Sequence, residues 1–227
     1  MRICRLITPV FLVLLVGLWN LSFTSSCSQS DAMVGTVLNS AEPAHPFELI
    51  DQFGQHSALS DHTGRVVVLT FLYTQCQDIC PIVTRKLWEV HQLLGNVSNQ
   101  VIFLAITVDP QRDTPSAVHK YSENWDMLEK WKFLTGDRTD LSPIWDAYYV
   151  APTIDEETYP SGDKSRSSGS LKGALNILRH ATEGSYKVKH PTPVYLIDRD
   201  GLMRVLFTPP LEPDRVAHDV RVLLKSG

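Results

Sequence analysis

Two cysteines, Cys76 and Cys80, lie between a run of strand-forming residues, 66–73, and a helix signal at Pro81. A turn from strand to helix places these thiols near the positive end of the helix dipole, which favours thiolate. A thiolate pair there can bind a soft metal ion or form a disulfide. The spacing tolerates a disulfide, but it is one residue wider than the C-x-x-C of ordinary thiol oxidoreductases and favours a metal chelate.

Two thiolates leave most metal sites incomplete, so the histidines are the next candidates. His190 stands just before a strand expected at residues 194–197, and in a thioredoxin-like sheet the loop before that strand faces the cysteine turn. Cys, Cys and His together suit Cu(I), and the imidazole also allows Cu(II), whereas a structural zinc site normally closes with four ligands. From the residues alone, a plain loop histidine remains the alternative. The other histidines have no geometric reason to meet the cysteines: His45, His56, His62, His91, His119, His180 and His218.

Composition limits the class of protein. Four cysteines in 227 residues are too few for a disulfide-stapled scaffold, and the 43% of hydrophobic residues can supply an ordinary core. The net charge of -4, with mixed signs, gives no electrostatic footprint for nucleic acid, so no nucleic-acid partner is expected.

The amino-terminal leader predicts attachment to a membrane. Arg2 and Arg5 precede an apolar stretch over residues 6–23, which is typical of a signal peptide or a single membrane anchor. The residues up to Cys27 resemble a bacterial lipobox, so residues 1–27 are expected to be a signal peptide or a membrane or lipid anchor. The basic residues keep the leader's start in the cytoplasm and place the domain on the extracytoplasmic face of a bacterial cytoplasmic membrane.

Strand and helix patterns alternate along the rest of the chain. After a polar linker at residues 28–45, strands are expected at 47–50, 66–73, 101–108, 194–197 and 202–207. Helices are expected at residues 81–94, with Val83, Leu87, Val90 and Leu94 on one face, and at 213–224. Two more are expected between them: one with Pro115 at its first position, and one that Asp140 or Ser142 caps and that runs through Tyr149. This order predicts an α/β, thioredoxin-like domain over residues 46–227, with extra amino-terminal elements.

A polar insertion at about residues 153–189 interrupts this pattern before the final hairpin. Its length without strand periodicity indicates a surface insertion or loop. Residues 171–181 within it have helical character, which predicts either a surface helix packed on the domain or a helix that docks a partner.

Three motifs in the same order resemble the Sco family (SenC/PrrC-like). They are F-L-Y-T-Q-C-Q-D-I-C-P at residues 71–81, V-D-P-Q-R-D-T-P at 108–115, and His190 ahead of Y-L-I-D at 195–198. The resemblance covers about residues 46–224. It implies a membrane-tethered thioredoxin fold that binds copper through Cys76, Cys80 and His190. It also implies a role in delivering copper to the dinuclear copper site of cytochrome c oxidase, or in reducing the cysteines of that site.

Individual positions qualify the resemblance. Asp109 and Asp113 match the family's acidic segment; Asp113 is expected to cap a helix, and Asp109 either has a structural role or touches the metal-site network or a partner. Lys189 stands where the family usually has Asp, and Gln77 replaces a common Pro. Pro193 precedes a strand, where thioredoxin-type oxidoreductases carry a cis-proline, so a cis bond is predicted there.

Two classes of function follow. In the first, copper is held by Cys76, Cys80 and His190 and passes by ligand exchange to the copper-bearing subunit of cytochrome c oxidase. In the second, the cysteines make the protein an extracytoplasmic thiol-disulfide oxidoreductase or redox sensor that acts on another extracytoplasmic thiol protein. A peroxidase is a weaker third alternative, because it would require neither the second cysteine nor His190.

Overall fold

Strand β4 (Val66–Leu72) lies inside the main sheet and leads directly into the two cysteines. All seven of its residues are buried, as expected for a strand whose two faces are both covered. It pairs in parallel with β5 (Val101–Thr107) and antiparallel with β9 (Val194–Ile197). Three apolar runs of the domain are therefore neighbouring strands.

The computed structural model describes residues 32–38, 40–155 and 186–226. Within these residues, the main sheet has six strands in the order β1-β10-β9-β4-β5-β6, and β2 with β3 and β7 with β8 form two further ladders. The remaining strands are β1 (Thr36–Val37), β2 (Glu48–Ile50), β3 (His56–Ala58), β6 (Lys132–Leu134), β7 (Thr153–Asp155), β8 (Lys187–Lys189) and β10 (Met203–Phe207). The helices are α2 (Ile79–Leu94), α3 (Pro115–Asn124), α4 (Arg138–Ala147) and α6 (Pro213–Lys225), with short 3-10 helices η1 (Leu59–His62) and η2 (Gly95–Gln100).

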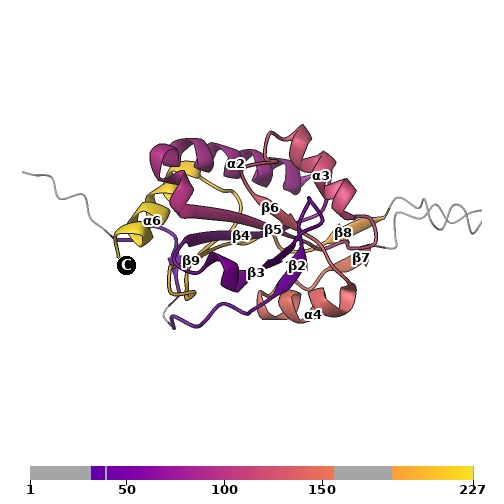
Figure 1. The fold of residues 1–227 in the computed structure, drawn as a ribbon, viewed down its shortest axis with the longest axis horizontal. Helices are drawn as coiled ribbons and strands as arrows, with labels where there is room; N and C mark the ends of the chain where they lie inside the picture. The colour runs from indigo at the N-terminus through magenta and orange to yellow at the C-terminus, as the bar shows by residue number, and fades with distance from the viewer. Residues whose placement is uncertain (1–31, 39, 156–185, 227) are drawn as a thin grey trace, which may run out of the picture. The chain divides into compact units, whose positions relative to one another are not determined.

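Helices cover both faces of this sheet. In Figure 1, α2, α3 and α6 lie above the sheet and α4 lies below it. The apolar face predicted for α2 is confirmed, because Val83, Leu87, Val90 and Leu94 are all buried. The predicted mixed α/β architecture is confirmed as well.

Helix starts differ from the prediction by a few residues. Helix α2 begins at Ile79, so Cys80 lies in its first turn and not before it. Helix α4 begins at Arg138 after Asp137, so the cap predicted at Asp140 or Ser142 is wrong. Acidic and hydroxyl residues recur along this segment, and their order alone does not select one as the cap.

Residues 32–38 are bound to the domain and form a strap across α6 and β10, although the sequence predicts a linker through residue 45. The carboxylate of buried Asp219 on α6 accepts hydrogen bonds from the backbone N–H groups of Val34 and Gly35, both at 2.8 Å. Strand β1 then pairs with β10. From Ala32 onward the predicted linker is therefore corrected, because a strand of two residues shows no periodic signal in the sequence.

The two ends of the predicted insertion also differ from expectation. Strands β7 and β8 pair antiparallel, with Thr153 opposite Lys189, so the insertion leaves and rejoins the domain through a short ladder. The helix predicted at residues 171–181 lies outside the described residues.

The leader predicted at residues 1–27, with Cys4 and Cys27, also lies outside the described residues. In the part of the chain that is described, no helix combines the length and the apolar character needed to cross a membrane.

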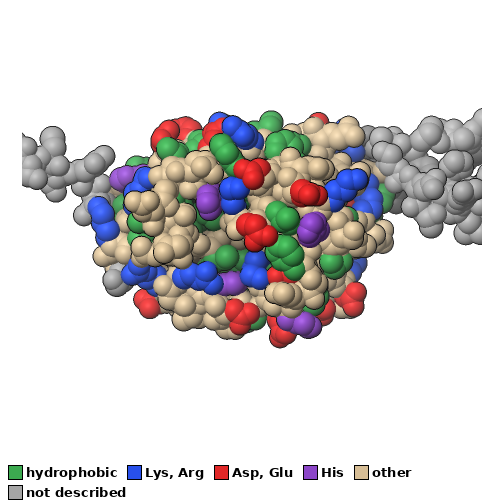
Figure 2. Space-filling view, turned by 45° about the horizontal axis from the view of Figure 1, so that its top comes forward, with side chains coloured by type: hydrophobic (Ala, Val, Ile, Leu, Met, Phe, Trp, Pro, Cys, Tyr) green, Lys and Arg blue, Asp and Glu red, His purple; other side chains and the backbone are tan. Residues whose placement is uncertain are grey.

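The surface carries charges of both signs. On the face shown in Figure 2, Lys and Arg side chains are interspersed with Asp and Glu side chains and with histidines. This mixture agrees with the small net charge of -4 and gives this face no extended field of one sign.

Candidate metal and thiol site

A buried carboxylate holds the start of the cysteine turn. Asp113, which is fully buried, accepts hydrogen bonds from the N–H and hydroxyl of Thr74 at 3.1 and 2.6 Å and from the Thr107 hydroxyl at 2.6 Å. The helix cap predicted at Asp113 is therefore wrong: Thr114 caps α3, where its hydroxyl accepts from the Ala117 N–H at 3.3 Å. Burial raises the pKa of Asp113 to about 6, although its hydrogen bonds with the two threonines oppose this shift.

The two cysteines are free thiols within contact of each other. Cys76 is 8% exposed and Cys80 is fully buried, and the Cys80 N–H donates a hydrogen bond to Cys76 Sγ at 3.5 Å. Hydrogen bonds from the Cys80 thiol and from the N–H groups of Cys80 and Asp78 lower the pKa of Cys76 to about 5, against the effect of burial. The pKa of Cys80 is raised, because the Cys80 thiol donates a hydrogen bond to the Cys76 sulfur and because Cys80 is buried. The pair therefore holds one proton near neutral pH, with the negative charge on the more exposed sulfur.

His190 lies in the segment that joins β8 to β9, beside the cysteine turn. Its ring packs edge-on against Tyr73, three residues before Cys76, with the ring centroids 5.7 Å apart. Its Nδ1 lies 2.6 Å from the Pro191 carbonyl oxygen, which can only accept, so Nδ1 carries the proton. Its Nε2 is buried and has no hydrogen-bond partner. Burial lowers the pKa of His190, although the Pro191 carbonyl and the charge of Cys76 oppose this shift.

A neutral imidazole of this kind fits a metal ligand. Metal-binding histidines commonly donate one ring N–H to a backbone carbonyl and coordinate through the other nitrogen. His190 has this arrangement toward Pro191, which leaves the Nε2 lone pair available. Two soft sulfur donors and one nitrogen donor suit copper.

The three predicted ligands do not form a closed ligand set. Among the described residues, no three Cys, His, Asp or Glu side chains are grouped closely enough to hold a metal ion. The His190 ring contacts Tyr73, three residues before Cys76, and the charge of Cys76 acts on the His190 imidazole. The assignment of His190 as a ligand therefore remains a prediction.

The predicted cis bond before Pro193 is wrong. The cis peptide bond found in the described residues joins Pro209 and Pro210, so Thr192–Pro193 is trans. The Pro193 carbonyl oxygen instead accepts a hydrogen bond from the buried hydroxyl of Thr70 at 2.9 Å, which fastens the histidine segment to β4.

Asp109 belongs to a cluster beside the site, and sequence reasoning missed its partners. Asp109 is 3% exposed and pairs with Nε of Arg112. It also accepts a hydrogen bond from the Tyr186 hydroxyl at 2.5 Å. Arg112 stands in the acidic motif and could have been singled out there, whereas Tyr186 lies in the polar insertion, where no pattern distinguishes it.

Other histidines have structural surroundings. His62 is hydrogen bonded to Ser57 at 3.3 Å and to Arg65 at 3.2 Å, and His218 lies 3.1 Å from the Ala32 carbonyl oxygen. His56 pairs with Glu48 at the surface. His180 lies outside the described residues.

The fold and the site together define a thioredoxin-like protein that carries a dithiol turn beside a histidine-bearing loop. The family model SCO1/SenC matches residues 36–171, a range that contains both cysteines and ends before His190. The chain therefore belongs to the SCO1/SenC family. The predicted family membership and the predicted thioredoxin-like fold are confirmed.

Known members give the scale of this similarity. The SCO1 protein homolog of Bacillus subtilis is 30% identical to this chain, over 69% of this chain and 68% of that protein. The structure of Bradyrhizobium japonicum ScoI with copper bound is 27% identical, with a TM-score of 0.62, over 79% of this chain and 98% of that one. BsSco, described as a member of the Sco family of cytochrome c oxidase assembly proteins, is similar in fold, with 21% identity and a TM-score of 0.60 over 85% of this chain and 99% of that one.

Proposed function

We propose that this protein binds copper through Cys76, Cys80 and His190 and delivers it to the dinuclear copper site of cytochrome c oxidase, or maintains the thiols of that site. The observation that carries the proposal is the buried Nε2 of His190, which has no hydrogen-bond partner and belongs to a ring that packs against Tyr73, three residues before the free thiol of Cys76. Family membership supports it, because a relative of known structure has copper bound and another is described as an oxidase assembly protein.

Copper is the cargo in this proposal, and the protein supplies three donor atoms that differ in their protonation before the metal binds. Cys76 is already a thiolate at neutral pH, whereas Cys80 must lose its proton when metal binds. The Pro191 carbonyl keeps the His190 proton on Nδ1. A site with three donors leaves room for a ligand from a partner, which transfer by ligand exchange requires.

Membrane attachment is part of the same proposal. The basic and apolar leader before residue 28 supports an anchor on the extracytoplasmic face, as a helix or through a lipid on Cys27. The thiols would then work in an oxidising compartment, where a separate reductant must keep them competent for copper.

A specific observation supports thiol-disulfide exchange as a second candidate. Cys76 is the more exposed sulfur and the one with the lowered pKa, whereas Cys80 is buried and protonated. The Cys76 thiolate would attack a client disulfide and release one client thiolate. Cys80, after losing its proton, would attack Cys76 and release the other, which leaves a Cys76–Cys80 disulfide and a reduced client.

Copper binding by matched variants separates the two candidates. The metal-free, reduced protein would be titrated with Cu(I) and Cu(II), with stoichiometry and spectra recorded for the wild type, Cys76→Ser, Cys80→Ser and His190→Ala. His56→Ala is the control, because this histidine lies on the surface, paired with Glu48.

The chaperone proposal predicts that His190→Ala loses most of its copper affinity while His56→Ala keeps it. Unchanged copper affinity in His190→Ala would overturn the three-ligand site. A pure oxidoreductase would keep nearly all of its disulfide-reductase activity in His190→Ala. Absence of peroxide turnover in the wild type would remove the peroxidase alternative.

A further inference from the structure

Tyr186 joins the strand that precedes His190 to the loop that follows β5. Its hydroxyl donates a hydrogen bond to Asp109 Oδ1 at 2.5 Å, and its carbonyl oxygen accepts one from Arg112 Nη1 at 3.0 Å. Its ring centroid lies 3.7 Å from the guanidinium carbon of Arg112, which is a cation–π contact. The side chain, backbone and ring of one residue therefore all bind the same loop, four residues before His190.

The loop that receives Tyr186 is tied to the framework that also holds the cysteine turn. Asp109 is 3% exposed, and its backbone N–H donates to the Thr107 hydroxyl oxygen at 2.9 Å. The Thr107 hydroxyl in turn donates to Asp113 at 2.6 Å, and Asp113 accepts the N–H of Thr74 in the cysteine turn. The segment before His190 and the cysteine turn are therefore both attached by hydrogen bonds to the same end of β5.

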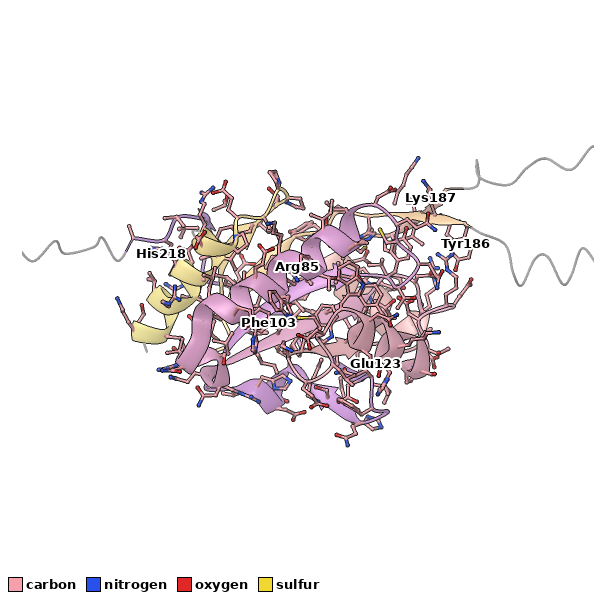
Figure 3. All side chains as sticks on the ribbon, turned by 90° about the horizontal axis from the view of Figure 1, so that it is seen from above. Arg85, Phe103, Glu123, Tyr186, Lys187 and His218 are labelled. Atoms are coloured by element: carbon pink, nitrogen blue, oxygen red, sulfur yellow. The ribbon has the colours of Figure 1, made fainter. Side chains whose placement is uncertain are left out.

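A second set of contacts fixes the chain at Val188, two residues closer to His190 than Tyr186. The Val188 N–H donates to the Tyr73 hydroxyl at 3.4 Å, and the Tyr73 ring packs against the His190 ring. Between these two sets of contacts, the exposed Lys187 lies 3.7 Å from Asp78 of the cysteine turn. Figure 3 shows Tyr186 and Lys187 at the end of the molecule away from His218 on α6.

We propose that Tyr186, held by Asp109 and Arg112, is a positioning residue that fixes the approach of His190 to the two cysteines. The inference rests on the proposed function for the assignment of His190 as a copper ligand. A strand fixed at two points presents the imidazole in a narrow range of positions, so less conformational freedom is lost when a metal binds. Residues that orient a metal ligand typically change affinity by about 10- to 100-fold when they are removed.

Copper titration of Tyr186 variants tests this inference. Tyr186→Phe keeps the ring and the backbone carbonyl and removes only the hydroxyl that reaches Asp109, so its copper affinity is expected to fall about tenfold. Tyr186→Ala also removes the ring and is expected to lose about 100-fold. Tyr149→Phe is the matched control, because Tyr149 is 83% exposed, and it is expected to bind as the wild type does. The electron paramagnetic resonance spectrum of bound Cu(II) should shift in both Tyr186 variants, since a displaced imidazole alters the nitrogen coupling.

A measurement without copper separates this inference from the proposed function. Amide hydrogen exchange at residues 187–190 of the metal-free protein should be faster in Tyr186→Phe than in the wild type and unchanged in Tyr149→Phe. If His190→Ala retains copper but exchange in Tyr186→Phe is faster, the proposed function fails and the hold on the strand stands. If His190→Ala loses copper while both Tyr186 variants keep wild-type affinity and spectrum, the positioning role is overturned. A lower thermal midpoint with an unchanged Cu(II) spectrum would also overturn it, because stability alone would then explain the contacts.

Discussion

The charge on Asp113 is expected to destabilise the fold at neutral pH while the carboxylate holds the cysteine turn. Its pKa is raised to about 6 in the fold, against 3.8 for the unperturbed group. The folded protein therefore holds this proton over a pH range in which the unfolded chain has lost it. A raised pKa contributes stability that is fully present below pH 3.8 and is lost as pH rises through 6.

The magnitude follows from proton linkage. With these two pKa values, the raised pKa of Asp113 makes the free energy of unfolding about 3 kcal/mol lower at pH 7, and about 1.5 kcal/mol lower at pH 5, than in acid where the carboxyl is protonated in both states. Lowering the pH from 7 to 5 should therefore stabilise the protein by about 1 kcal/mol through this residue alone. Asp113→Asn cannot titrate, so this contribution should vanish in the variant.

The assay is urea unfolding at pH 7, 6 and 5, monitored by tryptophan fluorescence in metal-free buffer. Both proteins should carry Cys76→Ser and Cys80→Ser, so that the thiols do not titrate in the same range. The variant should also be less stable at pH 5, because an amide cannot accept all the hydrogen bonds that Thr74 and Thr107 donate. A difference in unfolding free energy between the two proteins that does not change with pH would refute the reasoning.

Three other predictions follow from the described contacts. In the reduced, metal-free protein, mass spectrometry should find Cys76 alkylated by iodoacetamide at a rate that falls to half near pH 5, the value to which its pKa is lowered; a half-rate near pH 9 would contradict the hydrogen bonding described. Burial and the charge of Arg65 lower the pKa of His62 to about 4, so this group contributes stability above pH 6.5 that is lost as pH falls toward 4. Between pH 7 and 5 the wild type should lose about 1 to 2 kcal/mol more than His62→Gln in urea unfolding, and equal losses would show that His62 is not held neutral. Gly35→Ala should lower the free energy of unfolding by about 1 to 3 kcal/mol, because the new methyl group would lie 2.5 Å from a Val205 methyl carbon; an unchanged midpoint would show that the strap can shift.

Periodic signals in the sequence predicted the centre of the fold correctly. The apolar run that became β4 and the face of α2 that includes Leu87 are both buried, because a central strand and a packed helix each require a regular apolar pattern. The hairpin of β9 and β10 was marked by the turn over residues 198–201, where Gly201 has φ +80°. The short strands β1, β3, β6, β7 and β8 were missed, because two or three residues cannot show a period.

The candidate site was predicted in part. The turn that carries Cys76 and Cys80 follows from local order, since the strand, the thiols and the helix are consecutive in the chain. His190 was placed near the cysteine turn from its position before β9 in a thioredoxin-like sheet, and the family resemblance added its role as a ligand; its distance from the thiols is not set by any local pattern. The roles of Tyr73 and Tyr186 could not be read at all, because each acts through one contact with a residue distant in sequence.

By itself, the sequence determined which residues can do chemistry here and which segments must be buried to form a sheet with helices on both faces. Tertiary structure alone decided that Cys76 carries the charge while Cys80 keeps its proton, and that the His190 nitrogen is left unpaired. It also decided that one carboxylate, Asp113, holds the cysteine turn to the end of β5. The reason is physical: a pKa and a donor's availability depend on burial and on partners brought together from distant parts of the chain, and such contacts leave no periodic trace in the order of residues.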